Sequence, residues 1–127
     1  MFAKKKAQPI QQNPNRGMNE ELEIACFQII SHAGTARSQF IMAIDAAEKG
    51  DFDRAVELMA QGNEEYAISN RSHHEIVQME ESGSLREPHL LLVHCEDQMM
   101  SAEAFKVMAE KFISLYREVK AIKGDGS

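Results

Sequence analysis

Histidine is the residue type in this 127-residue chain with the widest capacity for nucleophilic or metal chemistry, and there are five. Imidazole is a nucleophile near neutral pH and a common metal ligand. No histidine here follows a glutamate by three residues, as the Glu-x-x-His motif of di-iron bundles requires. The zinc motif His-Glu-x-x-His also fails, because Gln78 stands four residues after His74. These spacings argue against a metal-storing or redox bundle. The five histidines are His32, His73, His74, His89 and His94.

His94 has the most informative surroundings of the five. It directly follows a run of four apolar residues, 90–93. On a helix it shares one side with Asp97, Gln98 and Ser101, which lie three, four and seven residues further on. Spacing alone leaves two interpretations, a hydrogen-bonded core histidine or a histidine at the edge of an interface.

Asp97 interrupts an apolar stripe formed by Val93, Met100, Ala104 and Val107. A carboxylate on such a stripe is costly unless it is paired or binds a cation. If the stripe lies on a symmetry axis, copies of Asp97 from several subunits converge, and they must then protonate or bind a cation. The alternative is a solvated aspartate at the rim of the helix.

Three helical segments must position these residues. The first is predicted over residues 19–48, with Asn19 as its N-cap and Gly50 just past its end. Its apolar residues recur at alternating spacings of four and three, which is a heptad seam. The seam consists of Leu22, Cys26, Ile29, Ala33, Ala36, Phe40, Ala43 and Ala47.

The second helix is predicted from its cap, Asp51, to a stop near Gly83, and the third from Pro88 to Lys123. The second seam consists of Phe52, Ala55, Met59, Gly62, Tyr66, Ser69, His73 and Ile76. The third helix carries the Asp97 stripe and a second seam of Phe105, Met108, Phe112, Leu115, Val119 and Ile122. One of these faces is expected to close against the first two helices and the other to meet a partner. Short connections predict an all-α, antiparallel, up-down-up three-helix bundle.

Composition and charge narrow the function. The net charge is −6, and residues 1–17 carry four basic residues and no acid, which leaves −10 on the remainder. An acidic body argues against nucleic acid as a partner. No segment is long and apolar enough to insert in a membrane. The two cysteines, Cys26 and Cys95, lack metal spacing and are expected to be reduced thiols in a cytoplasmic protein. The expected organisation is a disordered tail over 1–18, one helical domain over 19–123 and a disordered end over 124–127.

Three sequence blocks resemble the lactose/cellobiose class of enzyme IIA components of the bacterial phosphoenolpyruvate-dependent sugar phosphotransferase system. Residues 33–38, Ala-Gly-Thr-Ala-Arg-Ser, are similar to a family block in the first helix. Residues 50–55, Gly-Asp-Phe-Asp-Arg-Ala, are similar to one between the first two helices. Residues 94–100, His-Cys-Glu-Asp-Gln-Met-Met, are similar to the family's His-[Ala/Gly]-Gln-Asp-His-Leu-Met. The resemblance spans about residues 19–122.

The resemblance implies a phosphotransferase component that carries a phosphoryl group on a histidine. His94 is the implied catalytic residue, phosphorylated by the phosphocarrier HPr and dephosphorylated by a cysteine of the cognate IIB component, for uptake of a lactose- or cellobiose-type disaccharide. The implied assembly is a homotrimer, a nine-helix bundle, in which three copies of Asp97 bind a divalent cation, with Mg²⁺ expected, on the axis. Such a component is cytoplasmic and binds no nucleic acid.

Three departures from the family pattern change the polar surroundings of His94. Cys95, Glu96 and Gln98 replace the family's small residue, glutamine and second histidine. Gln98, and more weakly Ser101, could donate hydrogen bonds to a phosphoryl oxygen, whereas Arg37 is interpreted as a structural pairing residue on the helix surface. These departures keep open an alternative function, a helical regulatory or structural module that retains the fold without efficient phosphotransfer.

Overall fold

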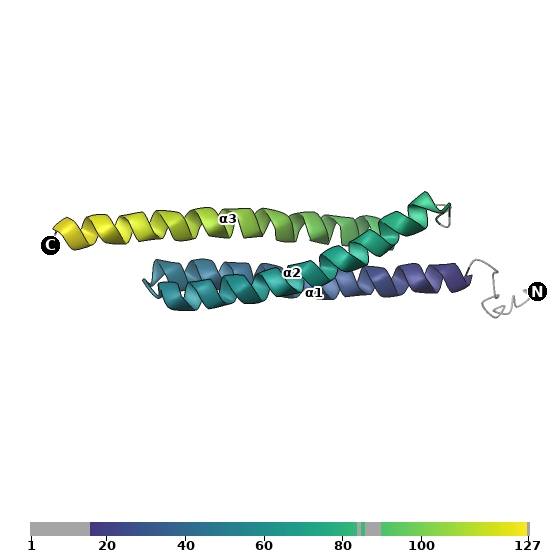
Figure 1. Cartoon of the computed structure of the whole chain (residues 1–127), viewed down its shortest axis with the longest axis horizontal. Coiled ribbons are helices and arrows are strands. Elements are labelled where there is room, and N and C mark those ends of the chain that lie inside the picture. Colours follow the sequence, from purple (N-terminus) through teal and green to yellow (C-terminus); the bar gives the residue numbers. More distant parts are fainter. Residues whose placement is uncertain (1–15, 84, 86–89, 127) are drawn as a thin grey trace, which may run out of the picture.

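The computed structural model describes residues 16–83, 85 and 90–126, which form three long helices. They are α1 (Arg16–Glu48), α2 (Phe52–Glu81) and α3 (Leu90–Gly126). The helices lie lengthwise, each running opposite to the one before it, and α3 projects beyond the turn between α1 and α2 (Figure 1). No strand occurs in these ranges, so the all-α prediction is confirmed for the described part of the chain. Helix α1 packs against both other helices and makes most of the interhelical contacts.

The heptad seam of α1 is confirmed at every position. All eight of its side chains are at most 3% exposed. The start of the helix differs from the prediction, because α1 begins at Arg16 and Asn19 lies inside it rather than at its cap. Pro14 is the last proline before this point, so every residue from Arg16 onward can contribute a backbone N–H to the helix. The predicted tail covered residues 1–18; residues 16–18 belong to α1, and residues 1–15 lie outside the described residues.

The turn between α1 and α2 follows the predicted chemistry. Gly50 has a φ of +85°, a left-handed conformation that a side chain would disfavour. The Asp51 side chain accepts a hydrogen bond from the backbone N–H of Arg54 at 3.1 Å, which caps α2. At its far end α2 stops at Glu81, and Gly83 again has a positive φ. The predicted start of the third helix, Pro88, lies outside the described residues.

The buried face of α3 is neither of the two predicted seams. Val93, Met100 and Val107 on the Asp97 stripe are 56%, 67% and 48% exposed. The second seam is mostly exposed as well, with only Phe105 and Val119 half-buried. The expectation that one of these seams closes against the first two helices is therefore wrong. The side chains that α3 buries are Cys95, Met99, Ala102, Ala109 and Ile113.

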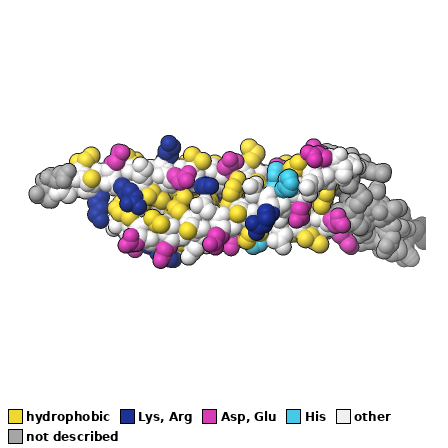
Figure 2. Space-filling view, in the orientation of Figure 1, with side chains coloured by type: hydrophobic (Ala, Val, Ile, Leu, Met, Phe, Trp, Pro, Cys, Tyr) yellow, Lys and Arg dark blue, Asp and Glu magenta, His cyan; other side chains and the backbone are white. Residues whose placement is uncertain are grey.

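Small side chains explain which face of α3 turns inward. The α1 seam contributes four alanines and a cysteine, and α3 meets it with Cys95, Ala102 and Ala109. Small residues on both sides let two helix axes approach closely, which favours this face of α3 over the stripes of larger residues. The larger apolar side chains of α3 consequently face outward, as scattered hydrophobic surface in Figure 2. None of the three helices, over their described residues, combines the length and apolar character needed to cross a membrane.

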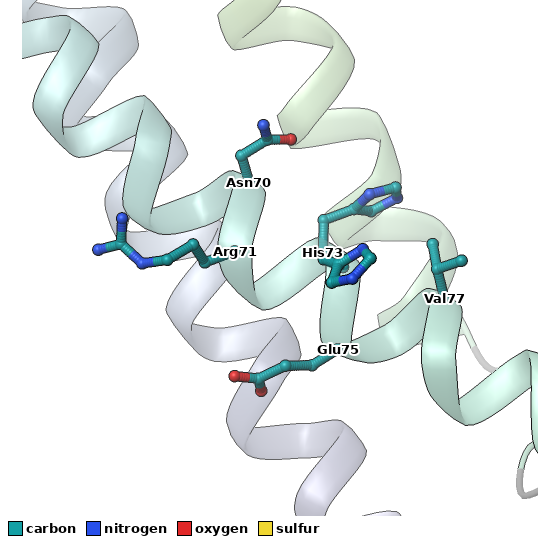
Figure 3. A pocket seen from close by; sticks show the side chains of 6 residues that line it. Asn70, Arg71, His73, Glu75 and Val77 are labelled. Carbon is teal, nitrogen blue, oxygen red and sulfur yellow. The ribbon is translucent and has the colours of Figure 1, made fainter.

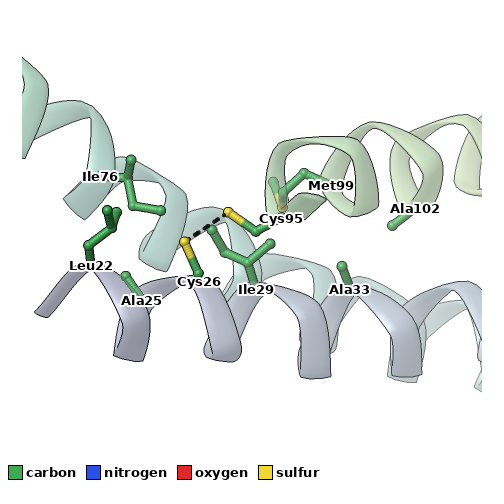
Figure 4. Packing of buried hydrophobic residues seen from close by; sticks show 9 residues of the cluster. All are labelled: Leu22, Ala25, Cys26, Ile29, Ala33, Ile76, Cys95, Met99 and Ala102. Carbon is green, nitrogen blue, oxygen red and sulfur yellow. Dashed lines mark hydrogen bonds between the residues drawn. The ribbon is translucent and has the colours of Figure 1, made fainter. Parts of the chain in front are cut away.

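The principal core cluster joins all three helices beneath the start of α3 (Figure 4). Its buried members are Leu22, Ala25, Cys26, Ile29, Ala33, Ile76, Cys95, Met99 and Ala102. The thiols of Cys26 and Cys95 are both free, as expected, and their Sγ atoms lie 3.2 Å apart. Burial raises the pKa of each thiol above its ordinary value. Both cysteines therefore stay protonated near neutral pH, which makes Cys95 a poor nucleophile although it adjoins His94.

Candidate functional site

His94 lies on α3 one turn after Leu90, where that helix begins. Its side chain is exposed, whereas the next residue, Cys95, is fully buried. This alternation excludes the core interpretation of His94 for the single chain. The helix backbone fixes the position of the imidazole while the ring itself is open to an approaching partner.

Gln98 and Ser101 lie on the same side of α3 as His94, as their spacing predicts, and both are half-buried. An arginine from α1 joins them. Nη1 of Arg37 donates to Oε1 of Gln98 at 2.9 Å and to Oγ of Ser101 at 3.1 Å. The side chains of Arg37, Gln98 and Ser101 therefore form a polar cluster within two turns of His94, and Arg37 makes it cationic.

Arg37 is the functional candidate that sequence analysis assigned only a structural role. The surface-pairing interpretation was right that it pairs, but its partners are the two residues proposed beside a phosphoryl group. The sequence does not show which residues of the first and third helices lie side by side, so it could not place Arg37 near Gln98 and Ser101. In the structure Cys26 of α1 contacts Cys95 of α3, so residues 69 positions apart in the sequence lie side by side on these two helices. The same offset places Arg37 about one turn beyond Ser101.

Two further histidines form hydrogen bonds between helices. Nδ1 of His32 and Oε2 of Glu65 are 2.5 Å apart, linking α1 to α2. Nε2 of His73 and Oε1 of Glu96 are 2.6 Å apart, linking α2 to α3. Both histidines are half-buried. The second contact engages Glu96, the carboxylate that departs from the family motif close to His94, with a histidine of α2.

A surface hollow lies on α2 beside this contact (Figure 3). Its lining consists of Asn70, Arg71, His73, His74, Glu75 and Val77. All six belong to one helix, and neither His94 nor Asp97 is among them. The hollow is therefore separate from the predicted site. The remaining histidine, His89, lies outside the described residues.

Asp97 is exposed on the outer side of α3, between Val93 and Met100. Among the residues described, no group of three or more histidine, cysteine, aspartate or glutamate side chains is arranged to hold a metal ion. One chain thus offers a cation a single carboxylate at this position. A carboxylate oxygen is a suitable ligand for a hard divalent cation, so the donor type fits, but a complete site requires further ligands.

The sequence pattern of the lactose/cellobiose-specific IIA subunit of the phosphotransferase system matches residues 24–117. The chain is 38% identical over 107 residues to the lichenan-specific phosphotransferase enzyme IIA component of Bacillus subtilis, covering 84% of this chain and 97% of that protein. It is 31% identical to the lactose-specific EIIA component of Streptococcus mutans, covering 77% and 94%.

Among solved structures, the cellobiose-specific enzyme IIA from Bacillus anthracis superimposes with a TM-score of 0.74 at 33% identity. The superposition covers 76% of this chain and 89% of that one. The family match, the sequence relatives and the shared fold agree, and the chain belongs to the lactose/cellobiose-specific IIA family of the phosphotransferase system.

Proposed function

We propose that this chain is a phosphohistidine carrier that accepts a phosphoryl group from HPr on His94 and passes it to a cysteine of its IIB partner. The carrier would act in the cytoplasm during uptake of a lactose- or cellobiose-type disaccharide. The observation that carries the proposal is an exposed imidazole on a rigid helix, with a polar group that contains a cation on the same side. Family membership supplies the donor and the acceptor.

The proposed reaction is two phosphoryl transfers through one ring nitrogen. In the first, a lone pair of the neutral His94 ring forms a bond to phosphorus, while the donor's bond to phosphorus breaks and the donor keeps its electron pair. In the second, the IIB thiolate forms a phosphorus–sulfur bond as the phosphorus–nitrogen bond breaks and returns its pair to the ring. Catalysis of such transfers depends mainly on positioning and on neutralising the phosphoryl oxygens.

The test is transfer of labelled phosphate from phosphoenolpyruvate through enzyme I and HPr to the purified full-length chain. We expect label that is stable in alkali, labile in acid and transferred onward when the IIB component is added. An unlabelled but correctly folded chain would overturn the carrier proposal and favour the alternative, a helical interaction module without chemistry.

We also propose that the working form is a homotrimer, a nine-helix assembly of three up-down-up bundles. The apolar residues of α3 that the single chain leaves exposed support this, because large apolar side chains that recur along one side of a helix indicate a contact with another protein surface. The stripe with Val93, Met100 and Val107 would face the threefold axis. Three copies of Asp97 would then converge there, where a divalent cation such as Mg²⁺ would neutralise them.

Replacing Asp97 with leucine is expected to strengthen the trimer and remove its need for a cation. Leucine completes the apolar stripe, and replacing converging buried charges with apolar side chains is often stabilising by about 1–4 kcal/mol. Sedimentation equilibrium with Mg²⁺ and with a chelator measures the effect. The wild type should dissociate more readily in chelator, whereas D97L should be insensitive to it.

Glu64→Leu is the matched control, because Glu64 is an exposed carboxylate on α2, a different helix from the one that carries the Asp97 stripe. It removes the same charge and should leave the response to chelator as in the wild type. A monomeric D97L protein would contradict the axial placement of Asp97.

A further inference from the structure

Arg37 on α1 is half-buried and reaches across to α3, where a single nitrogen donates to two side chains. The acceptors are Oε1 of Gln98 at 2.9 Å and Oγ of Ser101 at 3.1 Å. A guanidinium carries five N–H donors in a rigid plane, so these two contacts leave donors on its other nitrogens. Arg37 therefore combines two fixed contacts with capacity for a further acceptor.

The direction in which Arg37 reaches is toward His94. The residue before it, Ala36, belongs to a core cluster with Phe40 and Ala109, against which Phe105 packs. The backbone of Arg37 is therefore level with α3 beyond Ser101. Side chains on a helix incline toward its N-terminus, and α1 and α3 run in the same direction (Figure 1). From that level, the guanidinium extends back to Ser101 and then to Gln98, one turn from His94.

The contact with Gln98 fixes the orientation of its side-chain amide. Because the carbonyl oxygen faces the Arg37 guanidinium, the NH₂ group occupies the opposite end of the planar amide. That end can donate to an oxygen of a group carried on His94, whereas a flipped amide would present a carbonyl and repel it. Ser101, with its oxygen engaged by Arg37, keeps its own O–H as a donor.

Arg37 also brings a positive charge to the site where His94 would carry a phosphoryl group. A phosphoryl group on His94 brings about two negative charges to a turn of α3 that already contains Glu96 and Asp97. Glu96 is engaged by His73 at 2.6 Å, and Asp97 is exposed on the outer stripe. Arg37 contributes a permanent positive charge on the side of α3 that His94 shares with Gln98 and Ser101.

We propose that Arg37 is a positioning residue of the phosphoryl site: it holds Gln98 with its NH₂ group toward His94, and it neutralises the incoming phosphoryl group. The inference rests on the proposed carrier function and extends it to a residue of another helix. On this proposal Arg37 of α1 supplies the positive charge beside His94 of α3.

Phosphotransfer by Arg37→Met and Arg37→Lys variants of the full-length chain tests this. Methionine keeps much of the apolar stem but removes the charge and the donors. We expect R37M to lower the saturating rate of His94 phosphorylation by roughly 100- to 1,000-fold, the scale of losing one preorganised donor, with little change in the KM for phosphorylated HPr. Lysine should restore only part of the rate, because an ammonium cannot reproduce the planar fork.

Arg54→Met is the matched control, because Arg54 is an exposed arginine near the start of α2 that pairs with Glu57. It should transfer at the wild-type rate. Methylguanidinium, below the concentration that unfolds the chain, should raise the rate of R37M and leave that of R54M unchanged. Thermal unfolding followed by circular dichroism should give similar transitions for R37M and the wild type.

The outcomes separate this inference from the proposed function. If the wild type is never phosphorylated, the carrier proposal fails. If the wild type is phosphorylated and R37M matches it in rate, Arg37 has no role in transfer. A slow R37M protein that unfolds early and does not respond to methylguanidinium would show a merely structural arginine, which also overturns the inference.

Discussion

Replacing His94 with glutamine is expected to abolish phosphorylation of the chain while leaving its helices and stability intact. The glutamine side chain is similar in reach but has no basic nitrogen to attack phosphorus, so the carrier loses the atom that forms the covalent bond. We expect the rate of labelling from phosphorylated HPr to fall by at least about 10³-fold. Because His94 is exposed, the free energy of unfolding should change by no more than about 0.5 kcal/mol.

His74→Gln is the control, because His74 is also an exposed histidine, lies on α2 and lines the hollow described above. Its label should equal that of the wild type. Label retained by H94Q but lost in H74Q would place the phosphoryl group on the wrong helix for this proposal. Loss in both variants would indicate damage to the surface that HPr contacts rather than loss of one nucleophile.

The helices were predictable from the sequence where one apolar pattern dominated. On α1 the alternating spacing of four and three has no competitor, and all eight predicted positions are buried. On α3 two stripes of large apolar residues give a stronger apolar pattern than the face that is actually buried. The buried face includes Cys95, Ala102 and Ala109. Small residues contribute little to a hydrophobic pattern, yet they decide which helices approach closely. The inward face of α3 is a property of its fit to α1.

The candidate site shows the same division between local and long-range information. His94, Gln98 and Ser101 share a side because of helix periodicity, which a single segment reveals. The contact from Arg37 to Gln98 joins residues 61 positions apart and depends on how far α3 is shifted along α1. Periodicity within one helix carries no information about that shift. The contact between Cys26 and Cys95 in the core shows how far α3 is shifted along α1.

Phe40 is the largest fully buried side chain among the described residues, and replacing it with alanine is expected to destabilise the chain by about 3–5 kcal/mol. Its ring packs directly on Gly62 of α2, where an added Cβ would lie 2.5 Å from Cε1 and 2.8 Å from Cδ1. Alanine at position 62 is therefore unfavourable beside Phe40. In the F40A background the ring is absent, so Gly62→Ala should stabilise the chain by about 1 kcal/mol through its higher helix propensity.

Chemical denaturation at one fixed chain concentration measures this cycle, since assembly would make stability depend on concentration. The control is Gly34→Ala, because a Cβ on Gly34, inside α1, meets nothing within 4 Å. G34A should raise stability by about 1 kcal/mol in either background. The close contact of Phe40 with Gly62 predicts that G62A reverses sign between the two backgrounds while G34A does not. A G62A protein that gains stability beside Phe40, as G34A does, would show that α1 and α2 are further apart than this packing requires.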